Sequence, residues 1–190
     1  QAEAFYRAHN LPPRFQLGPA AQPTHLDDAL DARGYESYSP THVQTAVLDQ
    51  ITAQASHTVQ LAEMASAEWL ACHQQVSGYD DATLGIRAAI MGRVAAPKAF
   101  ATVRVNGRVA GIGFGVCAGG WLGLFCIETL PDYRRLGVGT AVVGALANWA
   151  KTQNTHHAYL QVTTQNEPAL ALYGRLGFAT TYTYHYRRLV

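Results

Sequence analysis

The sequence predicts a mixed α/β fold (an α+β mixed sheet): an antiparallel meander followed by βαβ units, with helices on both faces of the sheet. Segments 99–105, 108–117 and 121–129 are strand-like, and short turns join them. The first turn, Asn106-Gly107, is typical of a type I′ hairpin. Helical and strand-like segments then alternate, which favours βαβ units.

The segments before the meander are mostly helical by their period. Residues 65–75 and 81–93 place apolar side chains near i, i+3 and i+4, and residues 58–61 form a short strand candidate. Residues 2–9 also read as a helix. Because the chain begins with Gln1 inside that helix, we expect it to be a fragment of a longer protein or a trimmed chain.

A glycine-containing run links the strand 121–129 to an apolar, helix-periodic segment at 141–150. Its residues are Arg134, Arg135, Leu136, Gly137, Val138, Gly139 and Thr140. The two glycines allow a tight turn, and the following helix directs free N–H groups and its positive dipole end at that turn. The run therefore predicts a phosphate or pyrophosphate site. It is neither a Walker A loop nor G-x-G-x-x-G, and a plain strand-to-helix turn is the alternative.

A second strand and a short helix follow the long helix. Residues 158–162 are strand-like, and Pro168 suits the first turn of the next helix, which Asn166 or Thr164 can cap. Gly177 suits the position just beyond its end. The predicted order is strand, phosphate loop, long helix, strand, short helix and strand.

This arrangement resembles the GNAT superfamily of acyl-CoA-dependent N-acetyltransferases. The matching pieces are R-R-L-G-V-G-T at 134–140, N-x-x-A-x-x-L-Y at 166–173 and L-G-F at 176–178. The resemblance covers residues 99–187 and, less strongly, residues 58–97.

The resemblance implies acetyl-CoA (coenzyme A) as the cofactor. Backbone N–H groups of residues 135–140 would hold its pyrophosphate, and the backbone of residues 127–129 would pair with the pantetheine arm and polarise the thioester. Asn166 would bond the arm from the other side. Tyr173 would donate a proton to the leaving thiolate, the alternative being a tyrosine packed in the core. The implied cofactor-binding residues are Ile127, Glu128, Thr129, Arg134, Arg135, Leu136, Gly137, Val138, Gly139, Thr140, Asn166 and Tyr173.

Glu128 is the candidate general base. An amine must be neutral to attack, and deprotonation at pH 7 costs about 4.6 kcal/mol for a lysine-like amine and about 1.4 kcal/mol for an α-amine. Glu128 lies on the strand whose end faces the thioester, although strand alternation leaves open that its side chain points away. Ribosomal-protein N-terminal acetyltransferases of this superfamily carry a base glutamate where this chain has Gln161, which disfavours a protein N-terminus as substrate.

Residues 1–52 resemble the C-terminal region in their order of elements. Segments 15–17, 26–32 and 33–35 repeat the pattern strand, helix, glycine and aromatic residue. We interpret 1–52 as a partial, degenerate GNAT-like segment and 53–190 as the acetyltransferase domain, as in a tandem-GNAT protein with a truncated first repeat. A chance similarity between two αβ units is the alternative.

The composition limits the partners. A net charge of +1 gives no general attraction to nucleic acid or to an anionic membrane, and no apolar run of about 18 residues predicts a membrane span. Cys72, Cys117 and Cys126 have no C-x-x-C spacing, so free thiols in a reducing cytoplasm are expected, with Cys126 in the core rather than a nucleophile. The eight histidines include no H-E-x-x-H, and no metal site is predicted.

The leading hypothesis is an N-acetyltransferase that moves an acetyl group from acetyl-CoA to the primary amine of a small molecule by direct attack. A non-catalytic coenzyme A-binding regulatory module and a protein lysine or N-terminal acetyltransferase are the alternatives. The sequence leaves open the acceptor, the acyl group beyond acetyl, and the choice between monomer and homodimer.

Overall fold

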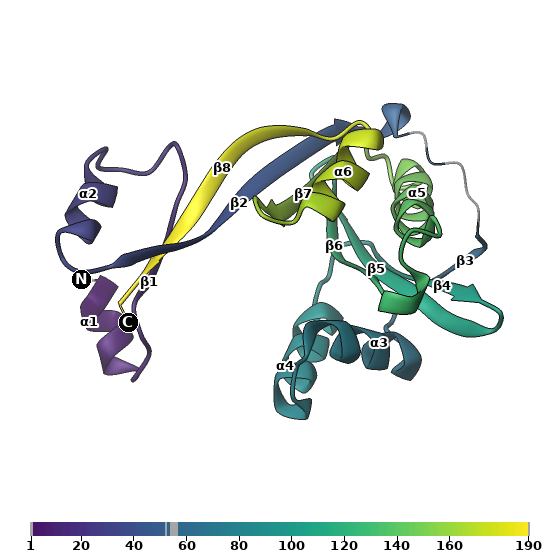
Figure 1. The fold of residues 1–190 in the computed structure, drawn as a ribbon, viewed down its shortest axis with the longest axis horizontal. Coiled ribbons are helices and arrows are strands. Elements are labelled where there is room, and N and C mark those ends of the chain that lie inside the picture. The colour runs from purple at the N-terminus through teal and green to yellow at the C-terminus, as the bar shows by residue number, and fades with distance from the viewer. Residues whose placement is uncertain (1, 52, 54–56, 190) are drawn as a thin grey trace. The chain divides into compact units, whose positions relative to one another are not determined.

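The computed structural model describes residues 2–51, 53 and 57–189 and confirms the predicted mixed α/β fold. One eight-stranded sheet has the order β1-β8-β2-β7-β6-β5-β4-β3 (Figure 1). The strands are β1 Arg14–Leu17, β2 Glu36–Val47, β3 Val59–Ala62, β4 Lys98–Val105, β5 Arg108–Ala118, β6 Trp121–Thr129, β7 His157–Thr163 and β8 Ala179–Arg188. The helices are α1 Ala2–Ala8, α2 Leu26–Asp31, α3 Ala67–Ser77, α4 Asp81–Gly92, α5 Val138–Lys151 and α6 Glu167–Arg175, with short 3-10 turns η1 Leu48–Gln50 and η2 Pro131–Tyr133.

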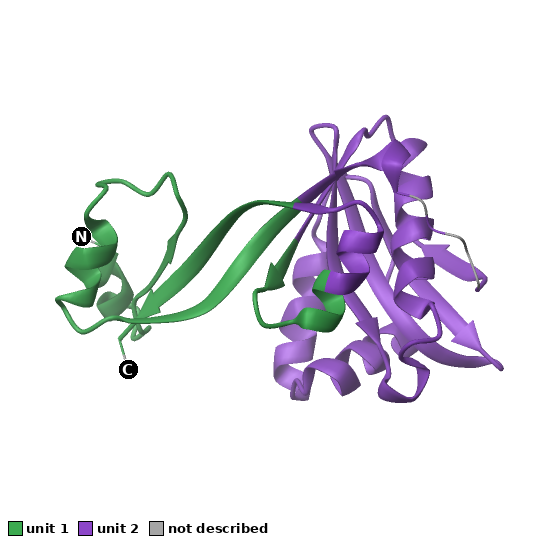
Figure 2. Ribbon diagram, turned by 45° about the horizontal axis from the view of Figure 1, so that its top comes forward, with its two compact units in different colours: residues 1–44, 161–170, 180–190 green, residues 45–160, 171–179 purple. Residues whose placement is uncertain are grey.

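The chain forms two compact units, coloured separately in Figure 2. The smaller unit contains residues 1–44, 161–170 and 180–190, and the larger contains residues 45–160 and 171–179. The predicted domain boundary after residue 52 falls on a residue outside the described part of the chain, as does Gln1. The two predicted domains and the tandem-repeat interpretation stay predictions.

The smaller unit has its own core. Leu17 at the end of β1, Leu30 of α2 and Tyr35 are at most 5% exposed and pack together. Strand β1 pairs with β8 in antiparallel register from Arg14↔Arg188 to Leu17↔His185. The strand-helix order predicted for residues 15–32 is confirmed at the level of secondary structure.

The larger unit contains the predicted meander, extended by one strand. Strands β3, β4, β5 and β6 are joined in sequence by antiparallel pairing. Asn106 and Gly107 have φ values of 51° and 78°, which confirms the type I′ turn. Strand β6 then pairs in parallel with β7, from Trp121↔His157 to Leu124↔Leu160.

A run of alternating glycines lets α5 lie close against β5. A side chain carbon added at Gly111 or Gly113 would collide with a residue of α5, and one added at Gly115 would be in tight contact with it. The colliding residues, Val138, Val142 and Leu146, recur every four positions and so form one face of that helix. Strand residues two apart share a face, so the three glycines all lie on the face of β5 that α5 covers. The side chains of α5 therefore pack directly against the backbone of β5.

The other face of β5 carries large side chains. Ile112 and Phe114 alternate with the glycines and pack in one core with Trp69 of α3 and Met91 of α4. The indole of Trp69 is fully buried and donates to the carbonyls of Ala101 at 3.1 Å and Gly113 at 3.2 Å. In the larger unit, α5 therefore covers one face of the meander, and α3 and α4 lie on the other (Figure 1).

We expect Gly113→Ala to lower the free energy of unfolding by about 1–3 kcal/mol, because the new methyl group overpacks against Val142 and Ile127. The melting temperature should fall by roughly 2–4 °C per kcal/mol for a chain of this size. Gly85→Ala is the matched control, since Gly85 lies in α4 with no atom within 4 Å of an added methyl group. It should gain about 0.5–1 kcal/mol from helix propensity. Equal melting temperatures for both variants would contradict the close packing of α5.

Candidate active site

An extra residue in β6 decides which way its side chains point. Ile112 of β5 pairs with Glu128, and Phe114 pairs with Phe125, so two steps on β5 match three on β6. Cys126, within this bulge, has a φ of 49°. In a regular strand, Phe125 and Glu128 would lie on opposite faces. The bulge brings both to the face covered by α3, which is a common use of bulges beside active sites.

Glu128 forms a hydrogen-bonded pair with His73 of α3. The His73 Nδ1 and Glu128 Oε1 atoms lie 2.9 Å apart, and the two side chains are 4% and 15% exposed. Within the described part of the chain, the buried atoms His73 Nε2 and Glu128 Oε2 have no hydrogen-bond partner. One carboxylate oxygen is thus held by the imidazole, and the other is buried without a hydrogen-bond partner among the described residues.

Burial raises the pKa of Glu128 above its ordinary value of 4.5. The charge and hydrogen bond of His73, and the charge of Arg87 on α4, oppose this shift. Desolvation wins because the carboxylate has lost most of its water. A carboxylate whose pKa moves toward neutrality is a better proton acceptor.

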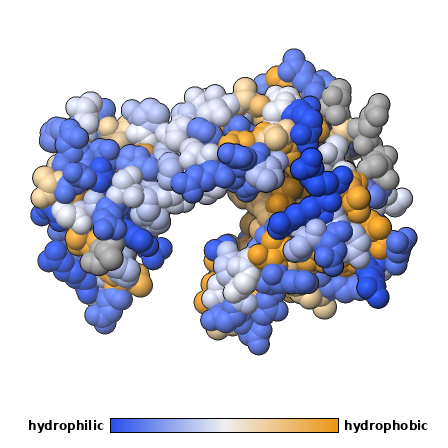
Figure 3. Space-filling model, in the orientation of Figure 1, coloured by the Kyte–Doolittle hydropathy of each residue, from blue (hydrophilic) through white to orange (hydrophobic). Residues whose placement is uncertain are grey.

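A hollow of about 390 Å³ adjoins this pair. Its aromatic lining residues are Phe114, Trp121, Phe125 and Tyr159, and its aliphatic ones are Ile90, Met91, Val94, Val116 and Ala118. His73, Arg87 and Cys126 complete the lining. Figure 3 shows apolar atoms gathered in the larger unit beside β6. The hollow is therefore an apolar pocket with His73, the hydrogen-bond partner of Glu128, at one place in its wall.

The thiols near Glu128 are held in their protonated form. Burial, reinforced by the charge of Glu128, raises the pKa of Cys72 and of Cys126 to about 11. Donor atoms of His73, Cys126 and Glu128 lie within 4.8 Å of one another, and these are ligand types that zinc binds. A thiol with so high a pKa must first lose its proton to bind a metal, which disfavours that use here.

The predicted phosphate loop leads into α5 as expected. Arg135 and Gly137 have φ values of 66° and 81°, and Gly137 caps α5 without any side-chain hydrogen bond. The N–H groups of the first turn are therefore left for another acceptor. Val138 is buried at 1% exposure and anchors the helix, whereas Arg134, Arg135 and Leu136 are exposed.

Two contacts fix this loop within the larger unit. The His57 Nε2 atom lies 2.6 Å from the Leu136 carbonyl oxygen. A side chain carbon added at Gly139 would lie 3.0 Å from Leu172 and 3.9 Å from the Thr129 hydroxyl. The start of α5, which includes Thr140, therefore lies beside the carboxyl end of β6, where Ile127, Glu128 and Thr129 are found.

Tyr173 and Asn166 lie on or next to α6. The Tyr173 side chain is 7% exposed, and the centroids of its ring and the Phe178 ring are 5.9 Å apart. Burial raises the pKa of Tyr173 to about 12. Asn166 accepts a hydrogen bond from the Ala169 N–H at 3.3 Å, which confirms it as a cap of α6. Asn166 belongs to the smaller unit and Tyr173 to the larger.

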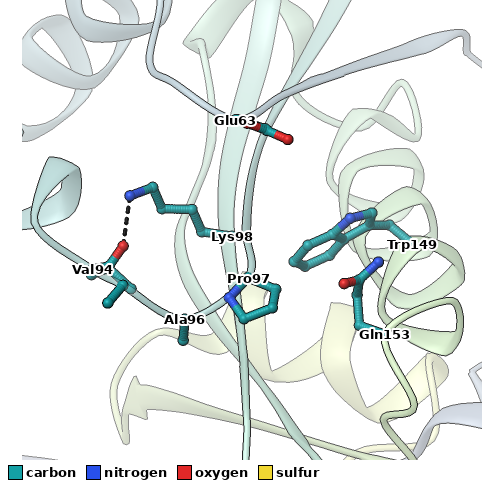
Figure 4. A pocket seen from close by; sticks show the side chains of 8 residues that line it. Glu63, Val94, Ala96, Pro97, Lys98, Trp149 and Gln153 are labelled. Atoms are coloured by element: carbon teal, nitrogen blue, oxygen red, sulfur yellow. Dashed lines mark hydrogen bonds between the residues drawn. The ribbon is translucent and has the colours of Figure 1, made fainter.

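Another hollow of the larger unit, of about 450 Å³, has a different character (Figure 4). The Lys98 ammonium donates to the carbonyls of Gly92 at 2.8 Å and Val94 at 2.6 Å. Lys98 therefore stabilises the end of α4, and Glu63 is the other charged residue in this lining. Because the Lys98 ammonium is bound by these carbonyls, whereas Glu128 is buried beside His73, we place the candidate active site at Glu128.

Similar proteins identify the class. A GCN5-related N-acetyltransferase from Kribbella flavida superposes with a TM-score of 0.72 at 20% identity, over 98% of this chain and 71% of that one. The "Uncharacterized N-acetyltransferase YobR" of Bacillus subtilis is 29% identical over 98% of this chain and 77% of its own length. Streptothricin acetyltransferase of Streptomyces lavendulae is 33% identical over 46% of this chain and 48% of its own.

The chain is thus an acetyl-transferring enzyme of the GNAT fold, as the motifs indicated. It belongs to the family described as "Probable histone acetyltransferase Rv0428c C-terminal", which matches residues 1–188. Among the described residues, no helix is long and apolar enough to cross a membrane.

Sequence reasoning missed His73 and most of the pocket lining. His73 and Glu128 are 55 residues apart, and no motif connects them. The sequence predicted a strand at 108–117, but the packing of its large side chains against α3 and α4 is a tertiary contact. The apolar periodicity of the predicted helices 65–75 and 81–93 was the one available signal that these segments pack against the sheet.

We expect the stability of the protein to fall as the pH rises through the titration of Glu128. A raised pKa means that the folded state keeps this proton at pH values where the unfolded chain, with its ordinary value of 4.5, has lost it. The loss begins near pH 4.5 and ends above the folded pKa, with a slope of at most about 1.4 kcal/mol per pH unit for one proton. In Glu128→Gln the loss should disappear, so chemical denaturation across this pH range should show a flatter curve. Parallel curves for the two proteins would contradict the desolvation of Glu128.

Proposed function

We propose that this chain transfers an acetyl group from acetyl-CoA to the primary amine of a small molecule by direct attack. The observation that carries the proposal is the position of Glu128. Its carboxylate has one oxygen held by His73 and one without a protein partner in the described residues. It also lies on the strand whose carboxyl end adjoins the loop that opens α5.

The loop fits a diphosphate-bearing cofactor. Gly137 has a φ of 81° and leaves the first N–H groups of α5 without a side-chain cap, which suits an anionic group. The backbone of residues 135–140 would hold the pyrophosphate, and the backbone of residues 127–129 the pantetheine arm. GNAT acetyltransferases use acetyl-CoA, and when bound it supplies an activated acetyl group with a thiolate leaving group.

Glu128 would take the proton that the attacking amine must lose. Its raised pKa reduces the difference in proton affinity between base and amine, and the hydrogen bond from His73 fixes the orientation of the carboxylate. The neighbouring thiols, with pKa values of about 11, are poor nucleophiles at neutral pH. This favours direct transfer over an acetylated cysteine.

Tyr173 would supply a proton to the leaving sulfur. With a pKa of about 12, its phenol is protonated at every pH at which the enzyme would work. Such a weak acid acts by donating a hydrogen bond as negative charge develops, and full proton transfer follows only if the thiolate is strongly basic.

Acetylation of a protein amine is the second candidate. The matching family is described as a probable histone acetyltransferase, which favours a lysine side chain. Against it, the pocket beside Glu128 is apolar and Arg87 lines it, so a lysine-rich basic segment would meet like charge there. Acetylation of lysine peptides but not of free amines would favour this candidate.

We expect Gly137→Asp to weaken acetyl-CoA binding by at least about 100-fold, or 2.7 kcal/mol, because it places a carboxylate beside the cofactor phosphates. Gly107→Asp is the matched control, since Gly107 also has a positive φ, of 78°, and lies in the open β4–β5 turn. Both variants should lose similar stability, but only Gly137→Asp should lose binding in calorimetric titration. Equal affinities of the two variants for acetyl-CoA would refute the proposal that this loop binds the cofactor phosphates.

Two substitutions test the proposed general base and general acid separately: Glu128→Gln and Tyr173→Phe. We expect Glu128→Gln to lower kcat/KM by about 10²–10⁴-fold at neutral pH, and by less at high pH where more of the amine is already neutral. Tyr173→Phe should lower kcat with little change in acetyl-CoA affinity. Thiol release with a panel of amines between pH 6 and 10 measures both effects. Full activity of Glu128→Gln would remove Glu128 as the base, and an unchanged kcat for Tyr173→Phe would remove Tyr173 as the acid.

A further inference from the structure

The apolar pocket is an elongated trough that runs along β5 and β6. Phe114, Val116 and Ala118 are alternate residues of β5, so they share one face, and all three line the pocket. At roughly 3.3 Å per residue they span about 13 Å. Glu128 pairs with Ile112, just beyond the Phe114 end, whereas Ala118 pairs with Trp121 at the far end.

Charge is confined to one end of this trough. The Arg87 guanidinium lies over the ring of Tyr79, 4.4 Å from its centroid. The ring centroids of Tyr79 and His73 are 5.5 Å apart, so Arg87 lies at the end of the trough where His73 holds Glu128. Among the described lining residues, those of the far half are apolar or aromatic, and none carries a carboxylate. The trough therefore offers a site for one amine at its Glu128 end and no partner for a second cation.

The apolar walls are exposed to an unusual extent. Ile90 is 60% exposed, Trp121 is 38% exposed and Phe125 is 37% exposed, and all three line the trough. Grouped apolar side chains of this size mark a surface that a ligand or partner covers. A volume of about 390 Å³ over that length suits an extended chain or a flat ring system rather than a folded peptide.

We propose that the acceptor is a monoamine with an extended apolar body, alkyl or aromatic, whose amine lies at Glu128 and whose body lies along the trough toward Ala118. This inference rests on the proposed function and specifies its substrate class. An acceptor with a second ammonium at its far end would lose water there without gaining a charged partner. Polyamines and other polycationic amines are therefore poor acceptors.

The test is a comparison of n-alkylamines from butyl to octyl with 1,8-diaminooctane, using the full chain and acetyl-CoA. The amines in the series have closely similar basicity, so kcat/KM reports the contribution of the body. We expect kcat/KM to rise by about twofold to fourfold per added methylene, as each one leaves water for the trough. The kcat/KM for the diamine should be at least about tenfold lower than that for n-octylamine, because its second ammonium must be desolvated.

A charge placed at the far end should reverse this preference. Ala118 is exposed and ends β5, so Ala118→Glu adds a carboxylate near the far end of the trough without disturbing Glu128. We expect this variant to raise kcat/KM for 1,8-diaminooctane and to lower kcat/KM for n-octylamine, each by several-fold. Ala118→Gln, which has the same shape without the charge, should impair n-octylamine only.

The outcomes separate the two proposals. Transfer that is independent of chain length, or a diamine that matches n-octylamine in the unaltered protein, overturns the trough as the acceptor site and leaves the acetyltransferase proposal intact. Faster acetylation of an apolar tetrapeptide than of n-octylamine also overturns it, in favour of a peptide substrate. No transfer to any amine overturns the proposed function itself.

Discussion

The close approach of α5 to the glycine face of β5 is the constraint on which the rest of the larger unit depends. Val138, Val142 and Leu146 occupy the space that side chains at Gly111, Gly113 and Gly115 would need. Because α5 lies this close, its first turn meets the carboxyl end of β6, where Thr129 approaches Gly139. The predicted phosphate loop is thus positioned by backbone packing, while Arg134 and Arg135 remain exposed.

The bulge in β6 divides the chemistry between the two faces of the meander. Gly113 lies opposite the extra residue, so the strand can bend there beneath Val142. On one face α5 and its loop are suited to an anionic cofactor. On the other face the bulge aligns Phe125 with Glu128, and His73 of α3 holds that carboxylate beside an apolar trough. The proposed base and acceptor site on one face, and the proposed cofactor loop on the other, thus adjoin the carboxyl end of the same strand, β6.

Local sequence patterns were sufficient to predict the helices and strands. The candidate site depends on tertiary contacts, which those patterns do not contain. The Asn106-Gly107 turn, the Asn166 cap and the positive φ of Gly177 follow from local chemistry, so the sequence predicted them. The direction of Glu128 was undecidable because one inserted residue reverses strand alternation, and a bulge leaves no reliable mark in a single sequence. His73 was missed for a similar reason, since its partner is 55 residues away. The repeat predicted for residues 1–52 shares its strand-helix order with the C-terminal region and stays a prediction.

The most direct test of the account is a thermal-shift titration of the protein with acetyl-CoA, coenzyme A and ATP in turn. A ligand at 100 times its dissociation constant stabilises the folded state by about 2.7 kcal/mol. For a chain of this size that corresponds to roughly 5–11 °C in melting temperature. We predict a saturable rise with both coenzyme A ligands and none with ATP. A rise with ATP alone, or with no ligand at all, would contradict the assignment of the α5 loop as the cofactor site.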